Sequence, residues 1–168
     1  MSTSKINKDN KDLELKKYRD LVLATLDYYL DYGILAVKTD DFDSTKHYRF
    51  LKVQAEEDYK KGRLTKLKQW FYSLTEMQIE TVDLKFNKYL LDKTQYDIDI
   101  FKSYFERIDK VVAKGKITSD RQFYDILSLV DHLCQAEIPD TSRINILNKL
   151  LADYEQKMSR RRSKQTNA

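Results

Sequence analysis

The stretch from Leu67 to Leu91 constrains the fold most strongly, because its apolar residues recur at steps of three and four. That spacing places side chains on one face of an α-helix. The series pauses at Thr75–Gln78, a four-residue pattern typical of the capping box that begins a helix. We therefore expect one helix to end near Leu74 and a second to begin at once. The apolar series is Leu67, Phe71, Leu74, Val82, Phe86, Tyr89 and Leu90, with the only tryptophan at position 70.

The scarcity of turn residues points the same way. The 168 residues include three glycines and one proline, and β architectures rich in turns need many more. The sequence thus predicts an all-α fold, an irregular helical bundle of six or seven helices with short turns. A repeat-like stack of helical hairpins is the alternative, although the sequence patterns of tetratricopeptide and ankyrin repeats are absent.

Apolar periodicity and capping residues together predict where the helices lie. Asp43 or Ser44 and the Ser119–Gln122 capping box favour helix starts, and Gly33, Gly62 and Gly115 favour helix ends. The two helices expected at 76–92 and 96–113 could also be continuous. The expected helices span 11–32, 44–61, 64–74, 76–92, 96–113, 119–134 and 141–158.

One helical domain is expected over residues 11–158. It is flanked by a disordered N-terminal segment, residues 1–10, and a flexible basic C-terminal tail, residues 159–168. Neither a signal peptide nor a membrane-spanning apolar run is present in the sequence, so a cytoplasmic location is expected. Cys134 is expected to be a small buried hydrophobe.

No set of residues has the spacing that catalysis or metal binding requires. The two histidines, His47 and His132, lack the neighbours of a di-metal or zinc site. The aspartates of Asp40–Asp43 resemble a calcium loop, but lysines stand where that loop needs glycine and glutamate. No catalytic residue, cofactor or metal is therefore predicted.

Two groups of basic residues are candidate contacts for a partner or for nucleic acid. The near balance of 31 basic and 27 acidic residues, a net charge of +4, gives only a mild overall attraction to anions. Local runs of cations can still bind a phosphate backbone. The first group surrounds Gly62 and the second lies in the C-terminal tail: Lys60, Lys61, Arg63, Lys66 and Lys68, then Arg160, Arg161, Arg162 and Lys164.

Three tyrosines are candidate interface residues, because they lie off the apolar faces of their helices. These are Tyr28, Tyr32 and Tyr72. Exposed tyrosine is enriched at protein-binding surfaces.

The leading functional hypothesis is a non-enzymatic helical protein-interaction module, such as an accessory subunit, adaptor or inhibitor-type protein. Its partner would be another protein, and association with a second copy as a homo-oligomer is left open. The alternative is a nucleic-acid-associated helical protein that uses the basic groups. A small-molecule or metal-dependent enzyme ranks last, since it needs Glu76, Glu80, Asp97 and Asp99 to converge inside the bundle.

Overall fold

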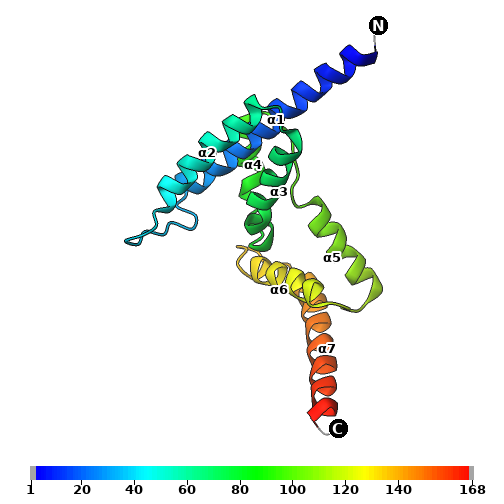
Figure 1. The fold of residues 1–168 in the computed structure, drawn as a ribbon. Coiled ribbons are helices and arrows are strands. Elements are labelled where there is room, and N and C mark those ends of the chain that lie inside the picture. Colours follow the sequence, from blue (N-terminus) through cyan, green and yellow to red (C-terminus); the bar gives the residue numbers. More distant parts are fainter. Residues whose placement is uncertain (1–2, 167–168) are drawn as a thin grey trace. The chain divides into compact units, whose positions relative to one another are not determined.

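The computed structural model describes residues 3–166. Within that range the chain forms seven helices and no strand, with a single isolated β-bridge between Lys38 and Asp43 (Figure 1). The prediction of an all-α fold with six or seven helices is therefore confirmed. The helices are α1 (Thr3–Asp31), α2 (Ser44–Lys60), α3 (Leu64–Glu80), α4 (Lys85–Thr94), α5 (Lys102–Lys114), α6 (Asp120–Cys134) and α7 (Thr141–Thr166).

The helices belong to two compact units. Unit 1 comprises Met1–Met77 and Leu84–Ile98, and unit 2 comprises Gln78–Asp83 and Asp99–Ala168. The boundary falls inside α3, whose last residues belong to unit 2. Each unit has its own buried apolar side chains, and the single domain expected over residues 11–158 stays a prediction.

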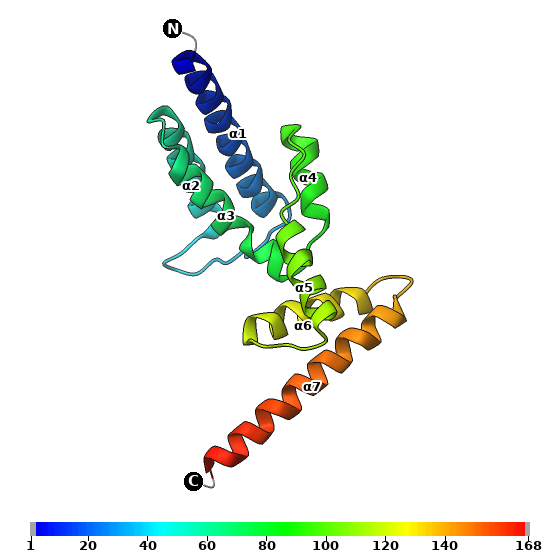
Figure 2. The same ribbon diagram turned by 90° about the vertical axis from the view of Figure 1, so that its right-hand side faces the viewer.

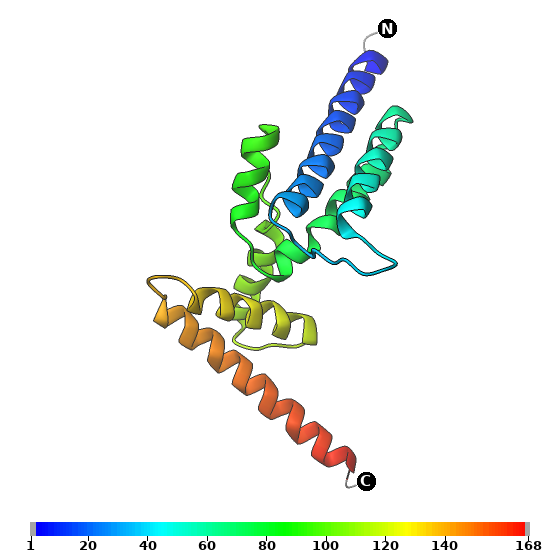
Figure 3. The ribbon, with the colours of Figure 1, turned by 90° about the vertical axis from the view of Figure 1, so that its left-hand side faces the viewer.

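Unit 1 is built around α1. Helix α2 runs antiparallel beside it after the connection at residues 32–43, and α4 also packs against α1 (Figures 1 and 3). Edge-to-face aromatic pairs join these helices, with 4.9 Å between the ring centres of Tyr28 and Phe86 and 5.3 Å between those of Tyr29 and Tyr48. Because α1 packs against other helices on two sides, its buried residues cover more of the helix surface than a single apolar face would.

Unit 2 packs α5, α6 and α7 together, with α6 and α7 forming a hairpin (Figure 2). At its centre the buried Tyr104 hydroxyl donates a hydrogen bond of 2.6 Å to the Asp125 carbonyl of α6. The helices bury one apolar cluster: Val82, Tyr104, Ile108, Val111, Ile117, Ile126, Leu129, Val130, Leu147, Leu150 and Leu151.

The predicted helix break at Thr75 is wrong. Helix α3 runs through it without interruption, because the buried Thr75 hydroxyl donates back to the carbonyls of Phe71 and Tyr72 within the same helix. A threonine hydroxyl can cap the start of a new helix, or it can donate a hydrogen bond to a carbonyl of the preceding helical turn. The Thr75 hydroxyl donates to the preceding turn. The chain turns instead at residues 81–84, where Val82 has a left-handed backbone with φ of 52°.

The other predicted boundaries agree better with the structure. Asp43 and Ser119 accept the backbone N–H groups of Lys46 and Gln122, as N-caps do. All three glycines follow helix ends with φ between 63° and 66°. Helices α4 and α5 are separate, since Gln95 adopts φ of 62° and ends α4 at Thr94. The predicted start of the next helix at residue 96 is wrong, because α5 begins at Lys102.

The two terminal helices extend further than the sequence predicted, and the disorder expected for residues 1–10 and 159–168 stays a prediction. Helix α1 begins at Thr3 rather than near Lys11, and α7 continues through the predicted tail to Thr166. Cys134 is exposed at the end of α6, so its predicted burial is wrong. The apolar neighbours that suggested burial point inward from other positions of the same helix.

Candidate functional site

The basic residues around Gly62 are largely engaged in ion pairs with nearby acids. Lys61 lies 3.2 Å from Glu57, and Lys68 lies 2.7 Å from Glu14 on α1. The remaining pairs join Arg63 and Lys66 to Asp58, whereas Lys60 is exposed. The local charge run in the sequence is therefore mostly neutralised in space, which weakens it as a site for a phosphate backbone.

Asp58, near the end of α2, forms ion pairs with two cations in and after the turn to α3. Its side chain is 3% exposed, and its two carboxylate oxygens lie 3.1 Å from Arg63 Nη1 and 2.9 Å from Lys66 Nζ. Burial alone would raise the pKa of Asp58, but the hydrogen bonds and charges of Lys66 and Arg63 outweigh it and hold the pKa below its ordinary value. These cations therefore have a structural partner inside the chain.

The second basic group lies on the last turns of α7. Of its members, Arg160 is exposed, as is the neighbouring Lys157. Arg161, Arg162 and Lys164 lie outside the residues whose side chains the structure describes. The backbone here is helical to Thr166, so the cations of the sequence are carried by a helix and not by an extended tail.

The three candidate tyrosines have different surroundings. Tyr28 is 5% exposed and is packed among aromatic rings of α1 and α4, so it does not belong to an exposed surface. Tyr32 and Tyr72 are 64% and 58% exposed, and their role at an interface stays a prediction. The Tyr72 hydroxyl lies 3.2 Å from that of Tyr18 on α1.

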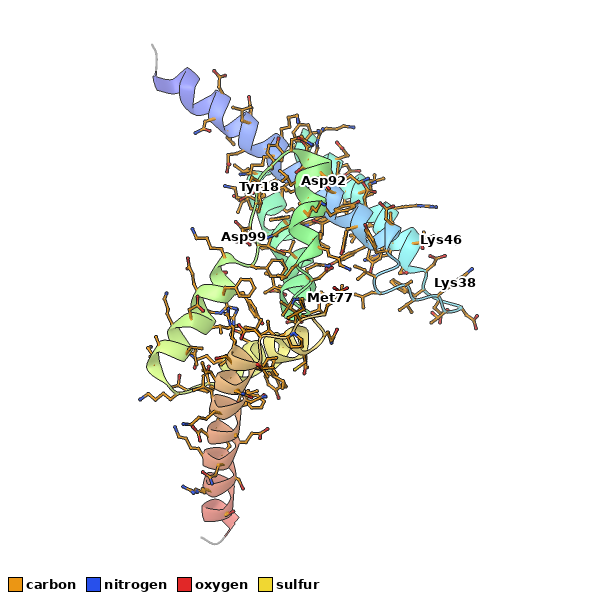
Figure 4. All side chains as sticks on the ribbon, turned by 180° about the vertical axis from the view of Figure 1, so that it is seen from behind. Tyr18, Lys38, Lys46, Met77, Asp92 and Asp99 are labelled. Atoms are coloured by element: carbon orange, nitrogen blue, oxygen red, sulfur yellow. The ribbon has the colours of Figure 1, made fainter. Side chains whose placement is uncertain are left out.

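The connection between α1 and α2 displays apolar side chains on an ordered backbone. Leu35, Val37 and Phe42, here called the connection surface, are 59%, 48% and 45% exposed. Hydrogen bonds across the loop run from Thr39 N to Phe42 O (2.8 Å) and from Ser44 N to Val37 O (3.0 Å). Figure 4 shows Lys38 and Lys46 at this end of unit 1. Backbone hydrogen bonds therefore join the two sides of the loop, while its apolar side chains stay about half exposed.

Helix α2 carries a second apolar feature that the sequence analysis missed. Phe50 and Val53, on the helix face opposite its buried residues, are 57% and 56% exposed. Together with Lys46 and Glu57 they form the outer stripe of α2. The signal was present in the sequence, because these four residues are spaced by four, three and four, the spacing of a coiled-coil seam.

Unit 2 has an aromatic groove of about 430 Å³ between the start of α6 and the second half of α7. The Tyr154 hydroxyl donates a hydrogen bond of 2.8 Å to Asp120 at its edge. Its other lining residues include Phe123, the exposed Tyr124 and Met158. A groove of this kind is typical of surfaces that accept a protein side chain.

The acids that an enzyme would need inside the bundle lie at the surface of their helices and connections. Glu76, Glu80, Asp97 and Asp99 are all exposed. Among residues 3–166, no cluster of three or more His, Cys, Asp or Glu side chains could hold a metal ion. None of the described helices has the length and apolar character needed to cross a membrane.

Comparison of the chain with known protein families, curated proteins and solved structures found no match.

Proposed function

We propose that this protein is a non-enzymatic, cytoplasmic protein-interaction module that binds another protein through the connection surface. The observation that carries the proposal is the ordered backbone under Leu35, Val37 and Phe42, each about half exposed. A preformed apolar surface binds at a smaller entropic penalty than a flexible loop does. Exposed apolar groups gathered in this way are typical of interaction sites.

The charges of the connection indicate the partner's chemistry. Residues 35–43 contain one lysine, Lys38, and three aspartates at positions 40, 41 and 43. Asp40 and Asp41 are exposed at the tip of the loop. A complementary partner presents an apolar patch bordered by arginine or lysine.

The test is affinity capture from lysate of the source cells with nuclease present, comparing the wild type with the Phe42→Ser variant. Phe42 is exposed, so this change removes apolar contact area without disturbing a core. The expected result is a defined protein that the wild type retains at moderate salt and the variant loses. Ile138→Ser, at an exposed apolar residue of unit 2 that belongs to none of the candidate surfaces, is the matched control and should retain it. Equal capture by wild type and Phe42→Ser would refute the proposal that the connection surface binds the partner.

A second candidate function is nucleic-acid binding through the end of α7. The observation that favours it is the continuation of α7 to Thr166, with no acidic residue after Glu155. Binding of a short DNA or RNA duplex should weaken steeply with salt, and should be lost when residues after Met158 are removed. Duplex binding that survives this truncation would refute it.

A further inference from the structure

We infer that the outer stripe of α2 pairs with the same stripe of a second copy, in an antiparallel helix–helix contact. This inference goes beyond the proposed function, since self-association needs no other protein. It starts from the exposure of Phe50 and Val53 on the face of α2 that points away from α1. Adjacent large apolar side chains on the outer face of a helix form a contiguous exposed patch, the kind of feature that marks an interaction site.

The spacing of the stripe gives the geometry of the contact. Lys46, Phe50, Val53 and Glu57 occupy alternating positions of a heptad seam. Asp43 precedes them by three residues and Lys60 follows by three, so the same seam continues to both ends of α2. Helices that meet along such a seam cross at a shallow angle, with axes about 8–10 Å apart.

The order of the charges selects an antiparallel pairing with a twofold axis midway between Phe50 and Val53. That axis places Phe50 opposite Val53 of the second copy, and Lys46 opposite its Glu57. It also brings Asp43 towards Lys60 of the second copy. Each apolar residue then meets an apolar residue and each charge meets its opposite, as a twofold interface requires. A parallel pairing would instead place Lys46 against Lys46 and Glu57 against Glu57.

The charged members of the stripe are accessible for this contact. Lys46 and Lys60 are exposed, and Glu57 pairs with Lys61 only at the surface, with its side chain 46% exposed. A surface ion pair of this kind exchanges partners at little free-energy cost. The apolar centre is small, so the dimer is a weak one whose population rises with protein concentration.

The test uses charge reversal and is read by sedimentation velocity over a series of protein concentrations. The wild type should pass from the 20.1 kDa monomer to a species of twice that mass. Lys46→Glu and Glu57→Lys should each weaken dimerisation at least about tenfold, because each creates two like-charge contacts. Lys88→Glu, the same change at an exposed position of α4, should leave dimerisation unchanged.

Mixing the two reversed chains provides the decisive result. An equimolar mixture of Lys46→Glu and Glu57→Lys should recover the dimer, since every contact is again between opposite charges. A wild type that stays monomeric at all concentrations, or a mixture that fails to recover the dimer, would overturn the inference. Capture of another protein through Phe42 is unaffected by either outcome, so failure of this inference and failure of the proposed function are distinguishable.

Disulfide trapping tests the direction of the helices. In a background in which Cys134 is replaced by serine, chains with Lys46→Cys and with Glu57→Cys should cross-link to one another. Cross-linking of Lys46→Cys chains to themselves alone would indicate a parallel contact and overturn the antiparallel arrangement.

Discussion

Replacing Asp58 by asparagine should destabilise unit 1 in a way that depends on pH. The substitution keeps the size of the side chain and removes its charge, while Arg63 and Lys66 remain beside it at 3.1 and 2.9 Å. Hydrogen bonds to charged groups contribute about 1.5–3 kcal/mol each when both partners are shielded. Here the cations are 52% and 43% exposed, so solvent screening reduces the total to about 2 kcal/mol.

The pH dependence follows from the lowered pKa of Asp58. In the unfolded chain this carboxyl titrates near its ordinary value of 3.8, and in the folded protein it titrates below that. The stabilisation is therefore fully present above the unfolded value and is lost as the pH falls through the folded one. The difference between wild type and Asp58→Asn should be largest at neutral pH and should shrink below about pH 4.

Urea unfolding followed by the fluorescence of Trp70 measures this difference. Trp70 is the only tryptophan, and Lys66 Nζ lies 5.5 Å from its ring centre, so it reports on the same corner. A loss of about 2 kcal/mol lowers the midpoint by about 1 M urea. Glu14→Gln, which removes the surface ion pair with Lys68, should shift it by only about 0.3 M. An unchanged midpoint for Asp58→Asn at pH 7, or an equal loss at pH 7 and pH 3, would refute the reasoning.

Three further predictions concern burial and backbone conformation. Tyr104→Phe should lower the free energy of unfolding of unit 2 by about 1 kcal/mol in thermal melts followed by circular dichroism. Because burial raises the pKa of Tyr104 above 10.0, the wild type should also lose stability above about pH 10, and the variant less so. Gln95→Gly should stabilise the protein by about 0.5 kcal/mol, since φ at this position is 62°; a lower melting temperature would contradict this. Tyr28→Ala should cost about 3 kcal/mol and Tyr32→Ala under about 1 kcal/mol in urea unfolding, and equal losses would contradict their different burial.

Local signals in the sequence predicted helix ends well. Gly33, Gly62 and Gly115 require only that the chain leave a helix in a left-handed conformation, which glycine adopts without strain. The caps at Asp43 and Ser119 likewise depend on a residue and the backbone three positions later. These interactions are complete within one turn, so no knowledge of the rest of the fold is needed.

Thr75 and Tyr28 were predicted incorrectly because their surroundings depend on distant residues. The pattern at Thr75–Gln78 fits both the start of a new helix and a continuous helix. In the structure the helix is continuous, and the side chains of Thr75 and Gln78 are buried. Tyr28 lies off the main apolar face of α1 and would be exposed on a helix with one neighbour. It is buried because α4, more than fifty residues later, covers that side.

The candidate surfaces depend on the three-dimensional arrangement of the chain even more strongly than the core does. A run such as Lys60–Lys68 reads as positive in the sequence, yet its acids come partly from Glu57 and Asp58 and partly from Glu14 on another helix. Charge runs therefore overstate a binding site whenever the fold supplies acids from elsewhere. The outer stripe of α2 is the opposite case, because Phe50 and Val53 are scattered among polar residues and attract no notice by composition. What distinguishes Phe50 and Val53 from other exposed apolar residues is their heptad spacing on the face of α2 opposite the core.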